Sequence, residues 1–158
     1  RIEAFAFNSC ESLININIPD HVNYIGNHAF GCCKSLTQIS MSDNVETLGQ
    51  RVFNKCSSLK SIRISNAITC IERGAFNGCE ALEAITLPSG VDSLAAFALT
   101  NCKALKSITM KSLTPPRLTE ETFDLLTYNA TLYVPRESIE LYRKSDIWNA
   151  FKEIKSID

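Results

Sequence analysis

The stretch FNGCEALEAITLPSGV, residues 76–91, contains a cysteine with no histidine or second cysteine close to it. That residue, Cys79, belongs to a series of residues that return every 23 positions. The clearest series are Cys10, Cys33, Cys56, Cys79 and Cys102; Phe7, Phe30, Phe53 and Phe76; Leu13, Leu36, Leu59, Leu82 and Leu105; and Ile16, Ile39, Ile62, Ile85 and Ile108. So many positions with one period indicate a structural repeat.

The repeat predicts a solenoid, because a 23-residue unit is too small to bury its own apolar side and must stack on its neighbours. Within one unit, LKSIRIS (59–65) alternates polar and apolar residues, which predicts a short half-buried strand. IERGAFNGC (71–79) predicts one or two helical turns that face inward. After the turn LPSGV, residues 91–94 predict a second, very short extended segment.

We therefore expect residues 1–123 to form an α/β solenoid of about five repeats. Five strands near residues 16, 39, 62, 85 and 108 should pair in one parallel sheet, and short helical turns should line the other side. Leu99 takes the place of the aromatic residue in the fifth repeat, and Phe123 follows with one residue inserted.

The cysteine series predicts buried free thiols, since a small apolar side chain fits an inward position and free cysteine is among the most buried residue types. Five in-register cysteines cannot all pair with one another, and zinc sites need closely spaced pairs of the CxxC kind. Cys32 and Cys70 lie outside the series, so we expect them to be more exposed and more easily oxidised.

Residues 124–158 do not repeat and are predicted to form a C-terminal cap, because the open end of a solenoid would expose its core. The pattern breaks at Pro115 and Pro116, where the second strand of the unit should lie. The elements expected after the break are a strand over 131–135, a helix over 137–144 with Ile139 and Tyr142 inward, and a shorter turn capped by Asp146 that carries Ile147, Trp148 and Phe151.

The sequence begins inside a repeat, which indicates a fragment of a longer protein, and no signal sequence is present in it. The first complete coil should then expose apolar side chains and an unpaired strand edge. We expect residues 1–8 to fray or the chain to self-associate through this end.

Composition and motifs argue against several classes of protein. Sixteen basic and seventeen acidic residues, without long runs of either sign, leave no footprint for nucleic acid or an anionic membrane. The longest apolar run, Leu94–Leu99, is far shorter than the ~20 residues that span a bilayer. No phosphate-binding loop, serine-nucleophile motif or zinc-protease motif occurs, so we expect no catalytic, cofactor or metal site. The two histidines, His21 and His28, are expected at the surface.

The unit IERGAFNGCEALEAITLPSGVDSL, with its AFxxCxxLxxI core, resembles the leucine-rich repeats of the BspA-like family of bacterial cell-surface proteins. The resemblance covers about residues 2–123. The tail TLYVPRESIELYRKSDIWNAFKEI resembles the C-terminal segment of many Bacteroides members of that family. These resemblances imply a right-handed leucine-rich-repeat superhelix, a location at the cell surface or outside the cell, and attachment to proteins of the host or of neighbouring cells.

The predicted binding surface is the outward side of the strands. Its candidate residues are Asn15, Asn17, Gln38, Ser40, Ser61, Arg63, Thr86, Ser107 and Thr109. Most are small and polar, and only Arg63 is typical of a binding hot spot. This composition suits a wide, weak contact with an extracellular or host-surface protein, or with an exposed glycan. It also suits a structural spacer that binds nothing.

Overall fold

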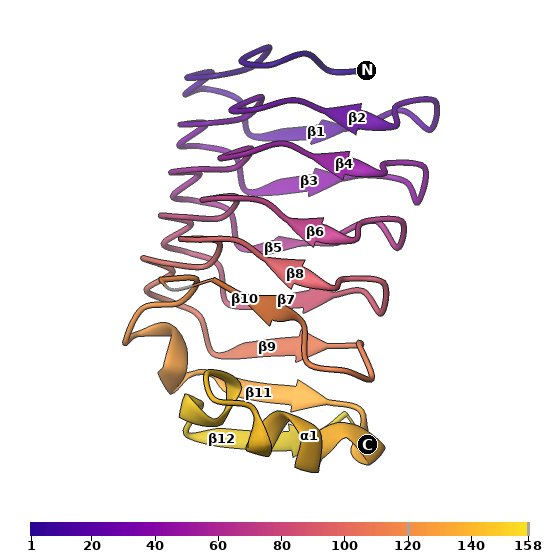
Figure 1. Cartoon of the computed structure of the whole chain (residues 1–158). Helices are drawn as coiled ribbons and strands as arrows, with labels where there is room; N and C mark the ends of the chain where they lie inside the picture. The colour runs from indigo at the N-terminus through magenta and orange to yellow at the C-terminus, as the bar shows by residue number, and fades with distance from the viewer. Residues whose placement is uncertain (120, 158) are drawn as a thin grey trace.

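The computed structural model describes residues 1–119 and 121–157, which wind into stacked coils with the N-terminus at one end and the C-terminus at the other (Figure 1). Each repeat contributes two short strands. A strand pairs in parallel with the corresponding strand of the next coil, so that Ile16 lies opposite Ile39 and Tyr24 opposite Thr47. This pairing confirms the repeat solenoid.

The longer strands follow one side of the stack. They are β1 (Asn15–Asn17), β3 (Gln38–Ser40), β5 (Ser61–Ile62), β7 (Ala84–Leu87), β9 (Ser107–Met110), β11 (Thr131–Val134) and β12 (Glu153–Ser156). The five predicted parallel strands are confirmed. They are divided, however, into a sheet β1-β3-β5 and a sheet β7-β9-β11-β12. A single parallel bridge, Arg63 to Thr86, joins the two sheets.

A second row of strands forms another side of the coils. It contains β2 (Tyr24–Ile25), β4 (Thr47–Leu48), β6 (Cys70–Ile71), β8 (Ser93–Leu94) and β10 (Arg117–Leu118). They pair as β2-β4 and β6-β8-β10. The last strand, β10, directly follows Pro115 and Pro116, so the prolines delay the second strand by one residue and do not abolish it.

The predicted helical turns are wrong: the third side of each coil consists of consecutive turns. In residues 71–79, Ala75, Asn77 and Cys79 donate their N–H groups three residues back within the coil. The intervening Gly74, Phe76 and Gly78 donate to the next coil instead. A helix would use every amide within its own coil, whereas this alternation holds neighbouring coils together on this side as well.

The alternation requires two residues per coil with positive φ. Glycine meets this requirement in one repeat, at Gly74 (φ 62°) and Gly78 (φ 77°), because it lacks a Cβ. Elsewhere ordinary residues adopt the left-handed conformation, which is uncommon for them. These residues are Phe5, Ser9, His28, Cys32, Arg51, Lys55, Phe97 and Asn101. The off-register Cys32 occupies one of these turn positions.

The core is a set of ladders that run along the stack. Phe7, Phe30, Phe53 and Phe76 stack face to face, with ring centroids 5.1, 5.7 and 5.6 Å apart. Three of these rings are completely buried, and the repeated leucines and isoleucines surround them. The apolar positions of the predicted helical turn are therefore buried as expected, although their backbone is not helical.

The cysteine ladder is buried in four of its five members, Cys33, Cys56, Cys79 and Cys102. Each of these thiols donates to the carbonyl of a ladder aromatic residue in the preceding coil, as Cys56 does to Phe30 at 3.1 Å. Burial raises the pKa of the Cys56 thiol to about 12, so this sulfur stays protonated and unreactive. The prediction is wrong for Cys10, which is exposed because no coil covers the first one.

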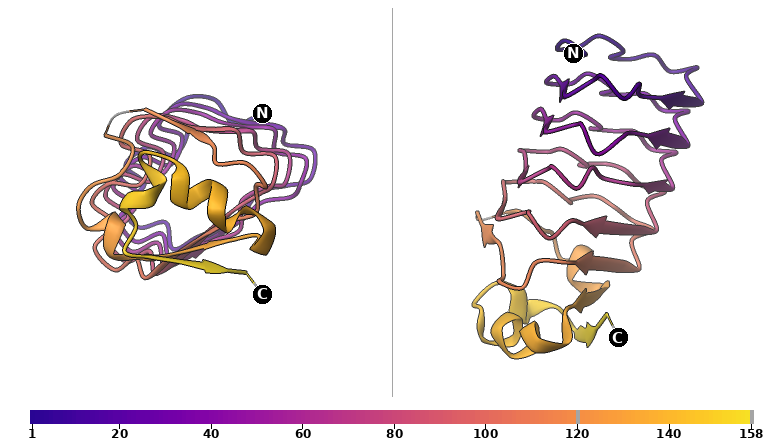
Figure 2. Two further views of the ribbon diagram at one scale, coloured as in Figure 1. Left: turned by 60° about the horizontal axis from the view of Figure 1, so that its bottom comes forward. Right: turned by 90° about the vertical axis from the view of Figure 1, so that its right-hand side faces the viewer.

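The C-terminal segment lies across the end of the stack (Figure 2). It contains η1 (Thr127–Asn129), the predicted strand β11, η2 (Arg136–Ser138), α1 (Ile139–Lys144), η3 (Trp148–Ala150) and β12. Trp148 is buried and donates its indole N–H to the carbonyl of Pro116 at 3.0 Å. Asp146 does not cap η3, because Ile147 holds the N-cap position without a side-chain hydrogen bond.

Backbone hydrogen bonds attach residues 1–9 to the second coil: Ile2, Phe5, Phe7 and Ser9 donate to it, and Gly26 donates back to Ile2. Its apolar side chains are less covered than those of later coils: Phe5 is 58% exposed, and Phe7 is only half-buried. Self-association through this end stays a prediction.

We expect a thiol reagent to distinguish two classes of cysteine. Cys10 and Cys32 should react first in the folded protein, and the half-buried Cys70, whose pKa is raised by burial, should react more slowly. The four ladder thiols should react only after unfolding, because burial keeps them protonated and covers them. Titration in denaturant without reductant should count seven thiols. A count near one would reveal disulfides, and equal reaction rates in the folded protein would contradict the burial.

We expect Trp148→Ala to destabilise the chain by about 3–5 kcal/mol, the usual cost of removing a buried tryptophan. The ring packs against Phe123, Tyr142 and Phe151, and its loss would also leave the Pro116 carbonyl without its donor. Urea denaturation measures the change. Leu141→Ala, at a side chain 51% exposed on α1, is the control and should have a small effect. Equal losses would contradict this role for Trp148.

Candidate protein-binding face

The nine predicted candidate residues all lie on the outward side of the longer strands. Register brings Asn15 beside Gln38 and Gln38 beside Ser61, and it places Thr86 between Arg63 and Thr109. Seven of the nine are exposed, and Ser107 and Thr109 are half-exposed. We call this surface the strand face.

The C-terminal segment extends the strand face by two strands that the repeat pattern did not include. In β11, Thr131 pairs with Ser107 and Tyr133 with Thr109. In β12, Glu153 and Lys155 pair with Thr131 and Tyr133. The only signal in the sequence was the short polar–apolar alternation in TLYV and EIKS, and only the first of these was predicted as a strand.

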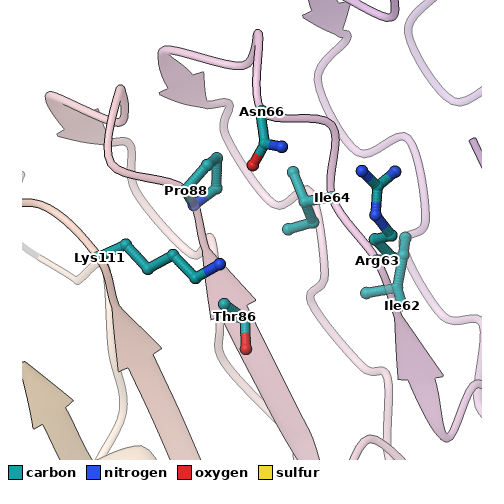
Figure 3. A pocket seen from close by; sticks show the side chains of 7 residues that line it. All are labelled: Ile62, Arg63, Ile64, Asn66, Thr86, Pro88 and Lys111. Carbon is teal, nitrogen blue, oxygen red and sulfur yellow. The ribbon is translucent and has the colours of Figure 1, made fainter. Parts of the chain in front are cut away.

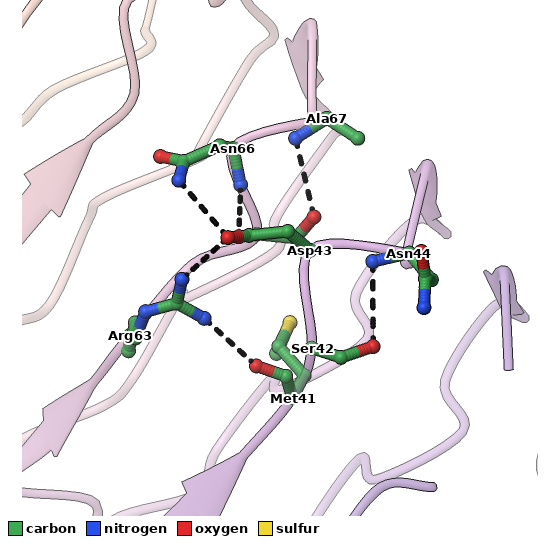
Figure 4. Close-up of polar contacts among 8 residues, drawn as sticks. Met41, Ser42, Asp43, Asn44, Arg63, Asn66 and Ala67 are labelled. Atoms are coloured by element: carbon green, nitrogen blue, oxygen red, sulfur yellow. Dashed lines mark hydrogen bonds and ion pairs between the residues drawn. The ribbon is translucent and has the colours of Figure 1, made fainter. Parts of the chain in front are cut away.

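Arg63, the single expected hot spot, is already engaged within the protein (Figure 4). Its Nη2 lies 2.7 Å from a carboxylate oxygen of Asp43, and its Nη1 donates to the carbonyl of Met41 at 3.0 Å. Asp43 also accepts hydrogen bonds from the backbone and side-chain N–H groups of Asn66. Arg63 and Asp43 therefore connect two neighbouring coils.

These contacts set the ionisation of Asp43. The backbone N–H of Asn66, followed by the side chain of Arg63, lowers the pKa of the Asp43 carboxyl below its usual value. About half of the Asp43 side chain and somewhat more than half of the Arg63 side chain are open to solvent. Solvent screening makes the ion pair alone a weak contribution. The hydrogen bonds to fixed backbone groups give the cluster its geometry.

The strand face is hollowed where its two sheets meet, in a groove of about 370 Å³ (Figure 3). It is lined by Ile62, Arg63, Ile64, Asn66, Thr86, Pro88 and Lys111. In Figure 3 the Lys111 side chain extends across the strand that bears Thr86 and Pro88, toward Ile64. We call this hollow the junction groove.

One backbone hydrogen bond just beyond the longer strands differs between coils. Lys111 donates its backbone N–H to the carbonyl of Leu87 at 3.0 Å, whereas Ser42 and Ser65, at the equivalent positions of earlier coils, do not make the corresponding bond. Proline has no N–H, so Pro88 cannot make the equivalent bond to Ile64. The carbonyl of Ile64 therefore receives no backbone donor from the next coil at the junction groove.

Metal-binding side chains do not cluster in the part of the chain that the structure describes. In residues 1–119 and 121–157, no group of three or more histidine, cysteine or acidic side chains could hold a metal ion. His21 is exposed, and His28 is half-buried against Phe5, with its ring centroid 5.0 Å away. Within the same residues, no helix has the length and apolar character needed to cross a membrane.

Comparison with known protein families shows to which family this chain belongs. The family model described as "BspA type Leucine rich repeat region (6 copies)" matches residues 1–139. The chain belongs to this family. No curated protein matches the sequence significantly.

Solved structures place these BspA-type repeats beside bacterial leucine-rich-repeat proteins. A leucine-rich cell-surface protein from Faecalibacterium prausnitzii is 25% identical over 92% of this chain, with a TM-score of 0.63. The pneumococcal vaccine antigen PcpA (22% identity, 99% coverage, TM-score 0.83) and a leucine-rich-repeat protein of T. pallidum (24%, 94%, 0.67) share the fold. The chain spans 32%, 39% and 72% of these three proteins respectively.

The turn after the first strand has proline in two repeats, at Pro19 and Pro88, serine in two, at Ser42 and Ser65, and lysine in one, at Lys111. Ser42 accepts a hydrogen bond from the N–H of Asn44, and Ser65 accepts one from the N–H of Ala67 (Figure 4). A serine hydroxyl bonded two residues ahead stabilises a turn in place of the fixed φ of proline. The departures from the repeat pattern therefore preserve the turn.

We expect Asp43→Asn to lower the free energy of unfolding at neutral pH and to make that free energy depend less on pH in the acid range. The pKa of Asp43 is depressed in the folded chain, so its contribution is present above the unfolded value of about 3.9 and disappears as pH falls through the folded value. The difference between variant and wild type should therefore shrink on acidification below pH ~4.

Urea denaturation at a series of pH values measures this. The matched control is Asp20→Asn, at the equivalent turn of the preceding coil, where the carboxylate accepts no hydrogen bond from the described residues. Identical pH profiles for the two variants would contradict a special role for Asp43.

Proposed function

We propose that this chain is a non-catalytic protein-binding module of a bacterial cell-surface or secreted protein, and that it binds through the strand face. The observation that carries the proposal is the strand face itself: seven strands in parallel register present outward side chains from consecutive coils. Their side chains are polar and mostly small, so this broad surface is available to a large partner without competing with the core.

The comparisons support a surface location for the parent protein. One structural relative is described as a leucine-rich cell-surface protein, and another as a vaccine antigen. The chain covers about a third of the first and two-fifths of the second, so it corresponds to part of such a protein. The proposed partner is an extracellular or host-surface protein.

The architecture proposed with this function has a right-handed superhelix of 23-residue repeats over residues 1–123 and a cap over 124–158. The burial of Trp148 and Tyr142 against the residues that follow β9 supports the cap. The proposal includes no cofactor.

A second candidate is a carbohydrate-binding surface module. Amide and hydroxyl side chains are concentrated on the strands nearest the N-terminus, where Asn15, Asn17, Gln38 and Ser40 line a shallow hollow of about 220 Å³. Asn17 accepts a hydrogen bond from the hydroxyl of Ser40 at 2.5 Å, so these groups are partly paired with each other. A structural spacer is the third candidate and predicts no ligand.

The test is a screen of arrayed host extracellular proteins and glycans with the 158-residue chain. We expect protein targets, and we expect the double variant Ser61→Arg, Ala84→Arg to lose them at least tenfold. These two exposed positions are neighbours on adjacent coils in the middle of the strand face, and two arginines would project into any contact there.

The matched control is the double variant Gln50→Arg, Thr69→Arg, which adds the same side chains at exposed positions outside the strand face. Retained binding by this control and loss by the strand-face variant support the proposal. Equal losses would place the contact elsewhere. Targets that are glycans would favour the second candidate, and a complete absence of targets would favour the spacer.

A further inference from the structure

The junction groove contains a positive charge that nothing in the described structure neutralises. In residues 1–119 and 121–157, the ammonium group of Lys111 forms no salt bridge, and the residue is exposed. Its side chain extends over the strand that bears Thr86 and Pro88, on the side of the groove opposite Arg63 (Figure 3). Arg63 carries the second positive charge, but Asp43 balances it. The groove therefore has an excess of one positive charge.

Hydrogen-bond donors surround this charge. A guanidinium group has five N–H donors, and Arg63 uses two of them, on Met41 and Asp43. The Thr86 hydroxyl makes no hydrogen bond with any described residue, and it lies on the same groove wall. Because Arg63 is held by Asp43, its remaining donors are fixed in orientation before any ligand arrives.

The groove also offers an acceptor. No described backbone N–H donates to the carbonyl of Ile64, and Pro88, at the facing position of the next coil, has none to donate. This carbonyl can accept an N–H from an incoming backbone. A peptide that carries a carboxylate and backbone N–H groups would satisfy both kinds of site.

We propose that the junction groove binds the carboxylate of a glutamate or aspartate side chain from a protein partner, with Lys111 as the principal cation. This inference rests on the proposed function and names the partner's chemistry at one point of the strand face. One excess positive charge matches one carboxylate better than a phosphate group, which carries nearly two negative charges. No aromatic side chain lines the groove, so a sugar ring has no face on which to stack.

The probe is a hexaglutamate peptide with acetylated and amidated ends, titrated into the ¹⁵N-labelled 158-residue chain at low salt. We expect chemical-shift changes concentrated at Arg63, Asn66, Thr86 and Lys111, and weaker binding as salt is added. Lys111→Gln should weaken binding roughly two- to fivefold, the range for an exposed ion pair. Lys111→Arg, which keeps the charge, should restore it.

Lys60→Gln is the matched control. Lys60 is also exposed and also flanks a strand of this face, but at the opposite strand end, so the variant changes the net charge equally. Equal weakening by the two variants would mean non-specific attraction and would overturn the inference. Equal chemical-shift changes with a neutral hexaglutamine peptide would also overturn the inference. Tighter binding of N-acetylneuraminic acid than of hexaglutamate at the same residues would overturn it as well.

The two proposals fail separately. If hexaglutamate does not bind at the groove while the variant Ser61→Arg, Ala84→Arg still abolishes array binding, the carboxylate site is wrong and the strand-face function stands. If hexaglutamate binds at the groove but the double variant binds the array targets as well as the wild type does, the groove binds carboxylates and the proposed function is wrong.

Discussion

The structure depends on one constraint: every coil must present its backbone N–H and C=O groups to the same positions of the next coil. Pairs such as Ile16–Ile39 and Ile71–Leu94 meet this requirement on two sides, and the alternating amides of the turns meet it on the third. The apolar side chains then recur at the same period, because a shifted coil would lose its hydrogen bonds and its core contacts together. The one inserted residue lies between β9 and β10, in the segment 111–116 that contains Pro115 and Pro116, where no strand pairing has to be kept.

Much of the coil arrangement and its core was predictable, because the spacing of the apolar residues gives both the repeat period and the buried positions. The backbone of the third side was not. Inward residues at 71, 75, 76 and 79 fit a helix as well as they fit turns, since both bury the same side chains. Only Gly74 and Gly78 hint at positive φ, and the other repeats place Arg51, Lys55 or Cys32 at those positions. Interactions between coils override local preference there.

The candidate site was predictable as a surface but not as a set of contacts. Alternation along each strand showed which side chains point outward, and register then brought them together. The sequence pattern could not show that Arg63 contacts Asp43. This bond joins the end of a strand in one coil to a turn in the preceding coil, and its spacing departs from the 23-residue register. The junction groove was equally hidden, since it lies where the two sheets meet and the 23-residue pattern of apolar residues continues without interruption there.

The exposed positions of the strands and the junction groove differ in how closely they are linked to the fold. Ser61 and Ala84 are exposed, so their side chains can change at little cost to the stack. The junction groove is tied to the backbone, because Arg63, which lines it, is bonded to Met41 and Asp43 of the preceding coil. A contact spread over the strand face would gain area from the exposed strand positions. Only the junction groove would give such a contact a fixed point of attachment, because it has oriented hydrogen-bond donors and an unpaired positive charge.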